Sequence, residues 1–404
     1  MPPLTKTDLL KMFKILGIEY EDIANSLVLG TTEQSLLSNE DKLEIAGHYC
    51  LIGTDGTTGA VAEDDPDAPT LVAASSIVWG VVANETCVQE ATNRIVLQGQ
   101  DRESNSGFRT MLELQQGVCL AIAMERGSFD CSGCPFADYG CTWKRKKLEP
   151  WTWFPGKTPV VICDLPVEFK FVTKLPKESP TRKFFETHLK HVFKAMRDNH
   201  VRVILVTHRS KIQDVSKEFT SQIDDAIGSL DERAKALIDV IKAKGIKLDG
   251  KLKTLAEIFD WAKDKDFTDY DLLESWMDDI GKPSPVFKVL PSDLNNMWGE
   301  LKFHYVTWGY RELLGLDRFY AQSCWVRIGY TPALDPVVAH KITLLEMALG
   351  KGHSIALTMA HNQCNMYKDK HLVLLKQHFN KDKTAKHRIG FSVKTTNKWR
   401  LSRS

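Results

Sequence analysis

The sequence lacks any apolar run of the roughly 18–20 residues that a membrane-spanning helix requires. Its opening, MPPLTKTDLLKMF, has no basic stretch followed by an apolar one, so we expect no secretory signal. Nine cysteines are scattered along the chain, and an odd number without a signal peptide favours reduced thiols over a disulfide framework. These absences argue against a membrane or secreted protein and predict an intracellular one, in the cytoplasm or nucleus.

Familiar catalytic motifs are also missing. The chain contains no GxSxG elbow, no HExxH zinc motif, no protein-kinase set and no caspase-like cysteine signature. Gly53, Gly56 and Gly59 form neither a GxGxxG nor a GxxxxGK[ST] loop, and the acidic residues around them would repel phosphate. We expect a turn there. The sequence therefore predicts a protein that is not an enzyme.

Charge is present but unevenly distributed. The 404 residues are 43% hydrophobic and 26% charged, which is typical of a globular protein with a sizeable core, and the net charge is only +1. Residues 1–130 hold 8 Lys and Arg against 20 Asp and Glu, whereas residues 144–211 hold 16 against 6 and residues 361–404 hold 11 against 2. Local clusters set the field that a charged partner meets, so this asymmetry points to a polyanion.

The spacing of apolar residues predicts a mainly α fold with a minor β component. The clearest stripe runs through 211–244 at spacings of three and four, with Gly245 placed to end the helix. Further helices are expected over 5–28, 33–48, 70–83, 85–98, 107–126, 180–199, 251–263, 268–280, 292–314 and 335–349. Runs rich in Val, Ile and Phe predict short strands at 159–163, 167–172 and 201–207. A stretch rich in Gly, Thr and Asp predicts a loop at 53–69.

Two basic segments are candidates for contacts with RNA. Lys and Arg neutralise phosphates and release counterions, and the interleaved aromatics, such as Trp151, Trp153 and Trp399, can stack on unpaired bases. The alternative is a solvated basic face followed by a basic tail. The candidate RNA-binding residues are Lys144, Arg145, Lys146, Lys147, Arg182, Lys183, Lys190, Lys194, Arg197, Arg202, Arg209, Lys211, Lys386 and Arg388.

Two further patterns could carry metal chemistry. Cys131, Cys134 and Cys141 have a close pair suited to one side of a structural Zn²⁺ site, with Cys163, His188 or His191 as a possible fourth ligand; ordinary thiols are the alternative. Asp164, Glu168 and Lys170 resemble the acid–x–Lys strand of metal-dependent nucleases, some of which also carry a Cys-x2-Cys-Pro cluster. Here the cysteines precede that strand instead of following it, and an amphipathic strand explains the same residues. No cofactor other than this possible zinc is expected.

One segment resembles a known family. PVFKVLPSDLNNMWGELKFHYVTW, residues 285–308, is similar to the segment that opens the late helices of the C-terminal lobe in nucleoproteins of non-segmented negative-strand RNA viruses, especially bornaviruses. The resemblance implies a two-lobed helical architecture that clamps single-stranded RNA between its lobes and exchanges terminal arms between neighbours. On that basis the chain divides into an arm at 1–28, an N-terminal lobe at 29–210, a helical C-terminal lobe at 211–375 and a basic tail at 376–404.

The function expected from the sequence is therefore that of a nucleocapsid protein. It would bind single-stranded RNA without sequence preference, polymerise on it through its arms, and reside in virions and in the host cytoplasm or nucleus. Two alternatives remain: a metal-dependent nuclease built on Glu168, Lys170 and the cysteine cluster, and a protein–protein scaffold whose basic tail binds an acidic partner.

Overall fold

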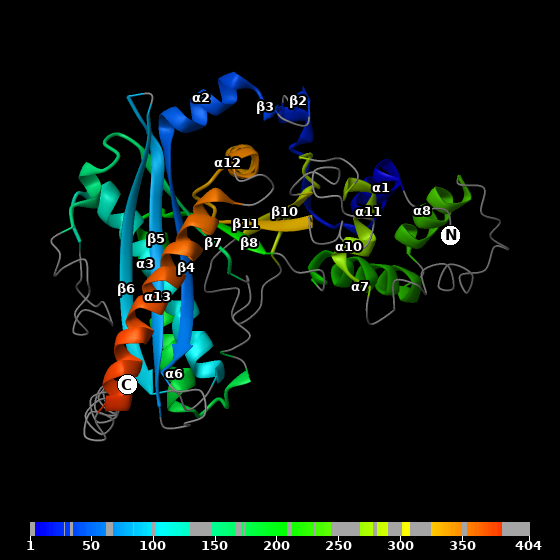
Figure 1. Ribbon diagram of the computed structural model, residues 1–404. Helices are drawn as coiled ribbons and strands as arrows, with labels where there is room; N and C mark the ends of the chain where they lie inside the picture. Colours follow the sequence, from blue (N-terminus) through cyan, green and yellow to red (C-terminus); the bar gives the residue numbers. More distant parts are fainter. Residues whose placement is uncertain are drawn as a thin grey trace. The chain divides into compact units, whose positions relative to one another are not determined.

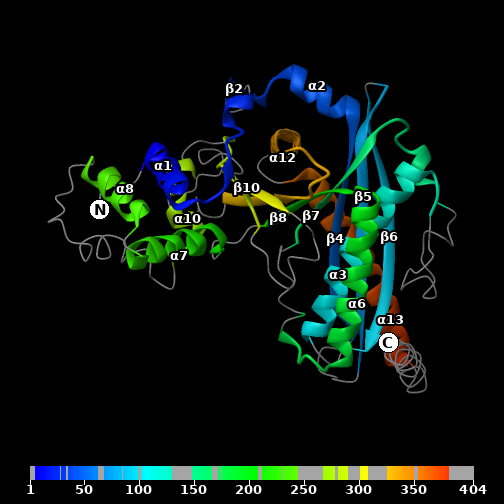
Figure 2. The same cartoon turned by 180° about the vertical axis from the view of Figure 1, so that it is seen from behind.

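The structure of the chain is a computed structural model (Figures 1 and 2). It describes residues 5–27, 29–32, 35–61, 68–83, 85–98, 102–129, 148–165, 172, 174–207, 212–229, 231–243, 267–277, 281–289, 301–307, 325–349 and 354–381. Contacts divide the chain into two compact units. Unit 1 comprises Met1–Ser38, Thr207–Pro291 and Glu300–Gly329, and unit 2 comprises Asn39–Val206, Ser292–Gly299 and Tyr330–Ser404.

Helices and strands alternate along much of the chain. The helices are α1 (Lys6–Leu16), α2 (Asn39–His48), α3 (Arg102–Arg126), α6 (Pro180–Asp198), α7 (Asp214–Ser229), α8 (Glu232–Lys242), α10 (Asp269–Leu272), α11 (Glu274–Met277), α12 (Pro336–Leu349) and α13 (Ile355–Lys381). The strands are β1 (Tyr20–Glu21), β2 (Leu29–Thr32), β3 (Ser35–Leu37), β4 (Tyr49–Ala60), β5 (Pro69–Val82), β6 (Glu85–Gln98), β7 (Thr158–Cys163), β8 (Arg202–Thr207), β9 (Val286–Lys288), β10 (Lys302–Thr307) and β11 (Trp325–Tyr330). Short 3₁₀ turns lie at Ala24–Ser26 and Pro150–Thr152.

Within the described residues, nine strands form a mixed sheet in the order β1-β9-β10-β11-β8-β7-β4-β5-β6. In unit 2, β4, β5 and β6 form an antiparallel meander, whereas β4 runs parallel to β7 and β7 parallel to β8. Parallel strands need a crossover, and α6 supplies it between β7 and β8.

Helices cover both faces of the unit 2 sheet. α13 lies along β4 and β5 on one face, and α3 lies on the other with α6 packed against it (Figures 1 and 2). Because both faces are covered, β5 is buried along nearly its whole length. Glycines let the helices approach β4 closely: a Cβ at Gly53 would lie 2.2 Å from the carbonyl oxygen of Ala356 on α13.

The predicted fold class is wrong, because the chain is built around a large mixed sheet and is not a mainly helical, two-lobed protein. The segments predicted as helices at 70–83 and 85–98 are the long strands β5 and β6. A strand buried on both faces has a continuous apolar run without alternation, and its alanines and length of 14 residues imitate a buried helix. The predicted loop at 53–69 begins as strand β4, in which glycine serves close packing and not a turn.

Other predicted elements are confirmed. The described chain has helices where 107–126, 180–199 and 335–349 were predicted, and strands at 159–163 and 201–207. The helix predicted at 5–28 ends at Leu16, because Gly17 adopts a left-handed conformation with φ of 72° and caps α1. The predicted strand at 167–172 and helix at 251–263 lie almost wholly outside the described residues.

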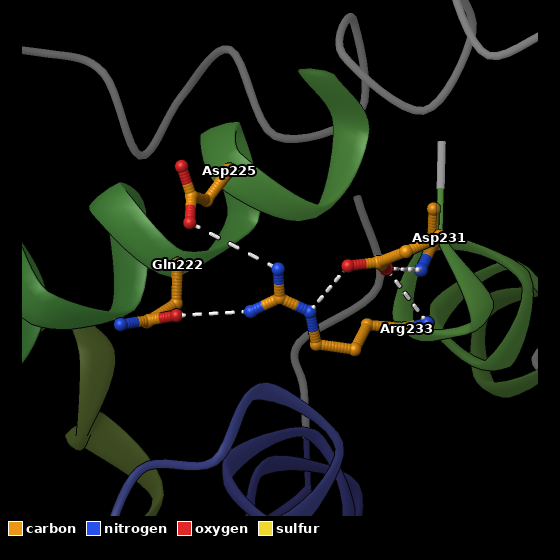
Figure 3. A network of polar contacts seen from close by, with 5 residues as sticks. Gln222, Asp225, Asp231 and Arg233 are labelled. Carbon is orange, nitrogen blue, oxygen red and sulfur yellow. Dashed lines mark hydrogen bonds and ion pairs between the residues drawn. The ribbon is translucent and has the colours of Figure 1, made fainter. Parts of the chain in front are cut away.

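Unit 1 has its own core, made largely by the apolar stripe predicted over 211–244. That stripe is divided into α7 and α8 because the Asp231 carboxylate caps α8, accepting the backbone N–H of Arg233 at 2.9 Å. Figure 3 shows the Arg233 guanidinium between Asp231 at 2.7 Å, Gln222 at 3.1 Å and Asp225 at 3.9 Å. The buried side chains of α1, α7 and α8 pack with those of β9 and β10; the largest are Phe13, Phe219, Phe287, Phe303 and Tyr305.

The segment that resembles viral nucleoproteins is not helical where it is described. β9 and β10 both lie within residues 285–308, and the predicted helix at 292–314 contains β10. Its aromatics Phe303 and Tyr305 are buried strand residues, since aromatic and β-branched side chains suit a packed sheet. Among the described helices, none has the length and apolar character needed to span a membrane.

Candidate active site

Two aspartates follow neighbouring parallel strands in unit 2. β4 pairs with β7 as far as Thr54 opposite Cys163, and the next residues along the two strands are Asp55 and Asp164. The carboxyl ends of parallel strands meet at the same edge of a sheet, where α/β proteins commonly bind ligands. β7 ends at Cys163 whereas β4 continues to Ala60, and Asp164 is exposed. At this step in the sheet the Asp164 side chain is therefore open to solvent.

A third carboxylate reaches β4 from α3. A Cβ at Gly56 would lie 2.6 Å from Cγ of Arg109 and 3.3 Å from Oε2 of Glu113, so only glycine lets α3 approach the strand this closely. The backbone N–H of Gly56 lowers the pKa of both the Asp55 and the Glu113 carboxylates, although burial raises both overall. Residues separated by about 60 positions in sequence thus come together at Gly56.

Glu113 is buried with unused bonding capacity. Glu113 is only 2% exposed, and its Oε1 has no hydrogen-bond partner in the part of the chain that the structure describes. Burial raises its pKa well above the ordinary value; the charge of Asp55 raises that pKa further, Arg109 lowers it and Asp164 raises it. Buried polar atoms are almost always paired, so an unpaired carboxylate oxygen beside a second carboxylate suggests a ligand-binding position.

Asp55 is held from the opposite face by α13. Nδ1 of His361 lies 2.9 Å from Oδ2 of Asp55, and the Asn365 amide lies 2.8 Å from Nε2 of the same imidazole. Lys368 can only donate, so its partner at 3.1 Å must be Oδ1 of Asn365, which turns the amide N–H₂ toward His361. In neutral His361, Nε2 is then the acceptor and Nδ1–H donates to Asp55. Burial raises the pKa of Asp55, whereas His361 lowers it.

The arrangement suits a hard divalent cation with few protein ligands. In the described residues, no three His, Cys, Asp or Glu side chains lie close enough to hold a metal ion together. Mg²⁺ usually keeps several waters and is bound by one or two carboxylates together with substrate phosphate oxygens, not by a complete protein cage. The pair Asp55 and Glu113, with Oε1 of Glu113 unpaired in the described chain, meets that requirement.

No protein-family model matches the sequence, and no curated protein is similar to it in sequence. Among solved structures, a crystal structure of NurA with manganese aligns over 88% of this chain and 89% of that chain, with a TM-score of 0.33 and 11% identity. Crystal structures of NurA and of NurA bound to dAMP and manganese each align over 78% of this chain and 84% of theirs, with a TM-score of 0.27 and identities of 10% and 12%. Similarity at this level carries no argument about function.

The described basic residues predicted to contact RNA are largely engaged in ion pairs. On α6, Arg182 lies 2.7 Å from Glu186 and Lys194 lies 2.6 Å from Asp198. Lys183 lies 2.9 Å from Glu178, and Arg202 on β8 lies 2.7 Å from Glu125. Lys190 and Arg197 also lie on α6. The remaining candidates lie outside the described residues; these are Lys144, Arg145, Lys146, Lys147, Arg209, Lys211, Lys386 and Arg388.

The metal-ligating residues predicted from the sequence lie mostly outside the described part. This applies to Cys131, Cys134 and Cys141 and to Glu168 and Lys170. Of the suggested fourth ligands, Cys163 is buried with its Sγ 3.2 Å from Oγ1 of Thr54, and burial raises the pKa of its thiol. Nδ1 of His188 lies 2.7 Å from the Phe184 carbonyl oxygen on the same helix.

Sequence reasoning missed Asp55 and Glu113. A usable signal was present: YCLIGTD and VVICD are both apolar runs that end in aspartate, as expected of parallel strands that deliver acids to one edge. Reading the glycines around Asp55 as a turn concealed it. Glu113 has no local signature, because only the packing of α3 on Gly56 gives it a role.

Proposed function

We propose that this protein is a divalent-cation-dependent hydrolase that cleaves phosphodiester bonds in nucleic acid, with its active site at Asp55, Glu113 and Asp164. The observation that carries the proposal is that Glu113 packs against Gly56, the residue after Asp55, while Oε1 of this buried glutamate has no partner in the described chain. The charge of Asp55 disfavours a charged Glu113, and a bound cation would relieve that repulsion.

The roles of the side chains follow from their positions. Asp55 and Glu113 would hold Mg²⁺ or Mn²⁺, which when bound polarises the phosphate and lowers the pKa of a bound water. His361 orients Asp55, and the absence of a side chain at Gly56 lets Glu113 approach the strand. Arg109 lies against Gly56 with an Nε–H that has no partner among the described residues. It would donate to a phosphate oxygen, for which the guanidinium geometry is well suited.

The choice of nucleic acid as substrate rests on charge. A phosphodiester brings its own negative charge to a site that already holds carboxylates, so cationic groups must surround them. Arg109 supplies such a group from α3, and Lys368 adds positive charge farther from the carboxylates, beyond His361 and Asn365 on α13. The sequence also places 11 Lys and Arg against 2 acids in 361–404. The proposed nuclease site thus uses Asp55, Glu113 and Asp164, and not Glu168 and Lys170, which the sequence suggested.

Cleavage assays test the proposal. Single-stranded DNA and RNA oligonucleotides labelled at one end are incubated with the full chain in Mg²⁺, Mn²⁺ or excess chelator. We expect cleavage with either metal, none with chelator, and loss of cleavage in Asp55→Asn. A matched control is Asp198→Asn, which alters an exposed acid on α6 that pairs with Lys194. Failure to cleave any nucleic acid, or equal activity in Asp55→Asn and wild type, would rule the proposal out.

The nucleocapsid function stays a prediction without an observation that favours it. Its helical architecture is wrong, and four of its six described basic residues are paired with acids. Polymerisation on RNA and residence in virions are likewise predictions that only the sequence motivates.

A further inference from the structure

α13 carries a row of polar side chains that leads away from the carboxylates. His361, Asn365 and Lys368 are spaced by four and three residues, so they lie on one face of the helix, and the row spans about 10 Å at 1.5 Å per residue. Thr57 of β4, two residues after Asp55, joins it by donating from Oγ1 to Oδ1 of Asn365 at 3.4 Å. We call these four residues the α13 row.

Lys368 is held in place by the strand beneath it. A Cβ at Gly59 would lie 3.3 Å from Cδ of Lys368 and 2.5 Å from Cδ1 of Leu372, so the aliphatic part of the lysine lies over β4. Its side chain is only 22% exposed, and its ammonium donates to Oδ1 of Asn365. Little side-chain entropy therefore remains to be lost when the ammonium meets a ligand.

The charge of Lys368 is not cancelled by the active-site acids. Its hydrogen bond goes to a neutral amide, and Oδ1 of the 71% exposed Asp369 lies 3.7 Å from its ammonium, a distance at which an exposed pair contributes little. Asn365 and His361 stand between the ammonium and Asp55. A positive charge kept apart from nearby carboxylates by neutral groups is suited to an anionic ligand that passes the site.

We infer that the α13 row binds the sugar–phosphate backbone of a single nucleic-acid strand beyond the scissile bond, with Lys368 contacting a phosphate one or more nucleotides from the carboxylates. The inference rests on the proposed function and extends it from the reacting bond to the strand around it. We favour single-stranded nucleic acid because the row forms one line of polar groups along α13, beside β4. The described residues of α13 offer no second, parallel line of cations that could contact a complementary strand.

The test compares two charge reversals on one helix. Lys368→Glu removes the proposed contact, and Lys370→Glu makes the same charge change at an exposed position two residues later, on another face of α13. Both variants and the wild type are assayed with a single-stranded oligonucleotide of about 20 nucleotides and with bis(p-nitrophenyl) phosphate, which has no backbone beyond the reacting bond. Binding of the labelled oligonucleotide is measured in chelator by fluorescence anisotropy at several salt concentrations.

We expect Lys368→Glu to lower kcat/KM on the oligonucleotide by on the order of 10-fold, to leave the small diester unaffected, and to reduce the salt slope of log affinity by about 0.7 or more. Lys370→Glu should change kcat/KM on the oligonucleotide and on the small diester by no more than about 2-fold, as expected of an exposed charge outside the contact. Equal losses on both substrates, equal effects of the two variants, or no effect of Lys368→Glu would overturn the inference. If the wild type cleaves nothing, the proposed function fails and anisotropy alone decides: unchanged binding in Lys368→Glu, or no binding by the wild type, overturns the α13 row.

Discussion

Two glutamates are buried in the described part of unit 2, and they differ in how their oxygens are used. Glu346 on α12 is 1% exposed and fully engaged: Oε1 accepts Nε1–H of Trp79 at 3.0 Å, and Oε2 accepts the backbone N–H of Ala356 at 3.0 Å and the Ser354 hydroxyl. Glu113 on α3 is 2% exposed and leaves Oε1 unpaired among the described residues.

The difference separates a structural carboxylate from one kept for a ligand. Glu346 connects β5 with the beginning of α13, so both of its oxygens stabilise the position of the helix that carries His361 and Lys368. Burial and the charges of Asp55 and Asp164 disfavour the charged form of Glu113, and Arg109 offsets only part of that cost. Burying a charge without full pairing is expensive, and such positions are retained mainly where function needs them.

The largest expected effect is on activity. Glu113→Gln keeps the shape of the side chain but removes its charge and one acceptor, so metal-dependent cleavage should fall on the order of 100-fold or more. Glu346→Gln, measured well below its unfolding temperature, should keep cleavage within about 3-fold, because Glu346 contacts no atom of the proposed site. Steady-state cleavage of the same oligonucleotide by both variants is the measurement. A similar loss in the two variants would remove the distinction.

The next effect is on stability, and it runs the other way. In Glu346→Gln one amide N–H₂ must face a donor that the carboxylate accepted, so unfolding by urea should cost about 1–3 kcal/mol less than in the wild type. Glu113→Gln removes a strained charge and should be as stable as the wild type or more so at pH 7.5 in chelator. If Glu113→Gln lost as much stability as Glu346→Gln, Glu113 would be a structural residue.

A third effect concerns the pH dependence of stability. Both glutamates have a pKa raised by burial, but that of Glu113 lies well above its ordinary value of 4.5, while Trp79, Ser354 and Ala356 lower that of Glu346. A raised pKa contributes stability that is complete below the unfolded pKa and is lost as pH rises through the folded pKa.

The stability of Glu113→Gln relative to the wild type should therefore increase as pH rises above about 4.5. The free energy of unfolding should differ by up to about 1.4 kcal/mol more per pH unit while pH lies between the unfolded and folded pKa values of Glu113. Urea unfolding in chelator between pH 5 and pH 8 measures this gain. A difference that stays constant over this range would show that Glu113 titrates as it does in the unfolded chain.

Much of the local structure could be predicted from the sequence, but the fold class could not. Amphipathic helices such as α6 and α12 and the Val- and Ile-rich strands β7 and β8 have the expected periods, since one face or a short run decides them. β5 has no period because α3 and α13 bury both of its faces, and its partners are known only once the chain is folded. The prediction of a helical protein failed at that strand and its neighbours.

The candidate site was predictable only in part for the same reason. Asp164 was noticed beside its strand, but Asp55 was hidden among glycines that looked like a turn. Glycine is needed at these positions because helices pack closely on both faces of β4, α13 at Gly53 and α3 at Gly56. A long-range packing constraint thus produced a local pattern that is typical of a loop.

Titration with Mn²⁺ tests the central claim most directly, because the paramagnetic signal of the free ion reports binding without any need for catalysis. The wild type and Glu346→Gln should bind Mn²⁺ with the same affinity, and Glu113→Gln should bind it at least about 10-fold more weakly, as expected when a ligand carboxylate is lost. Equal Mn²⁺ binding by Glu113→Gln and the wild type would contradict the account.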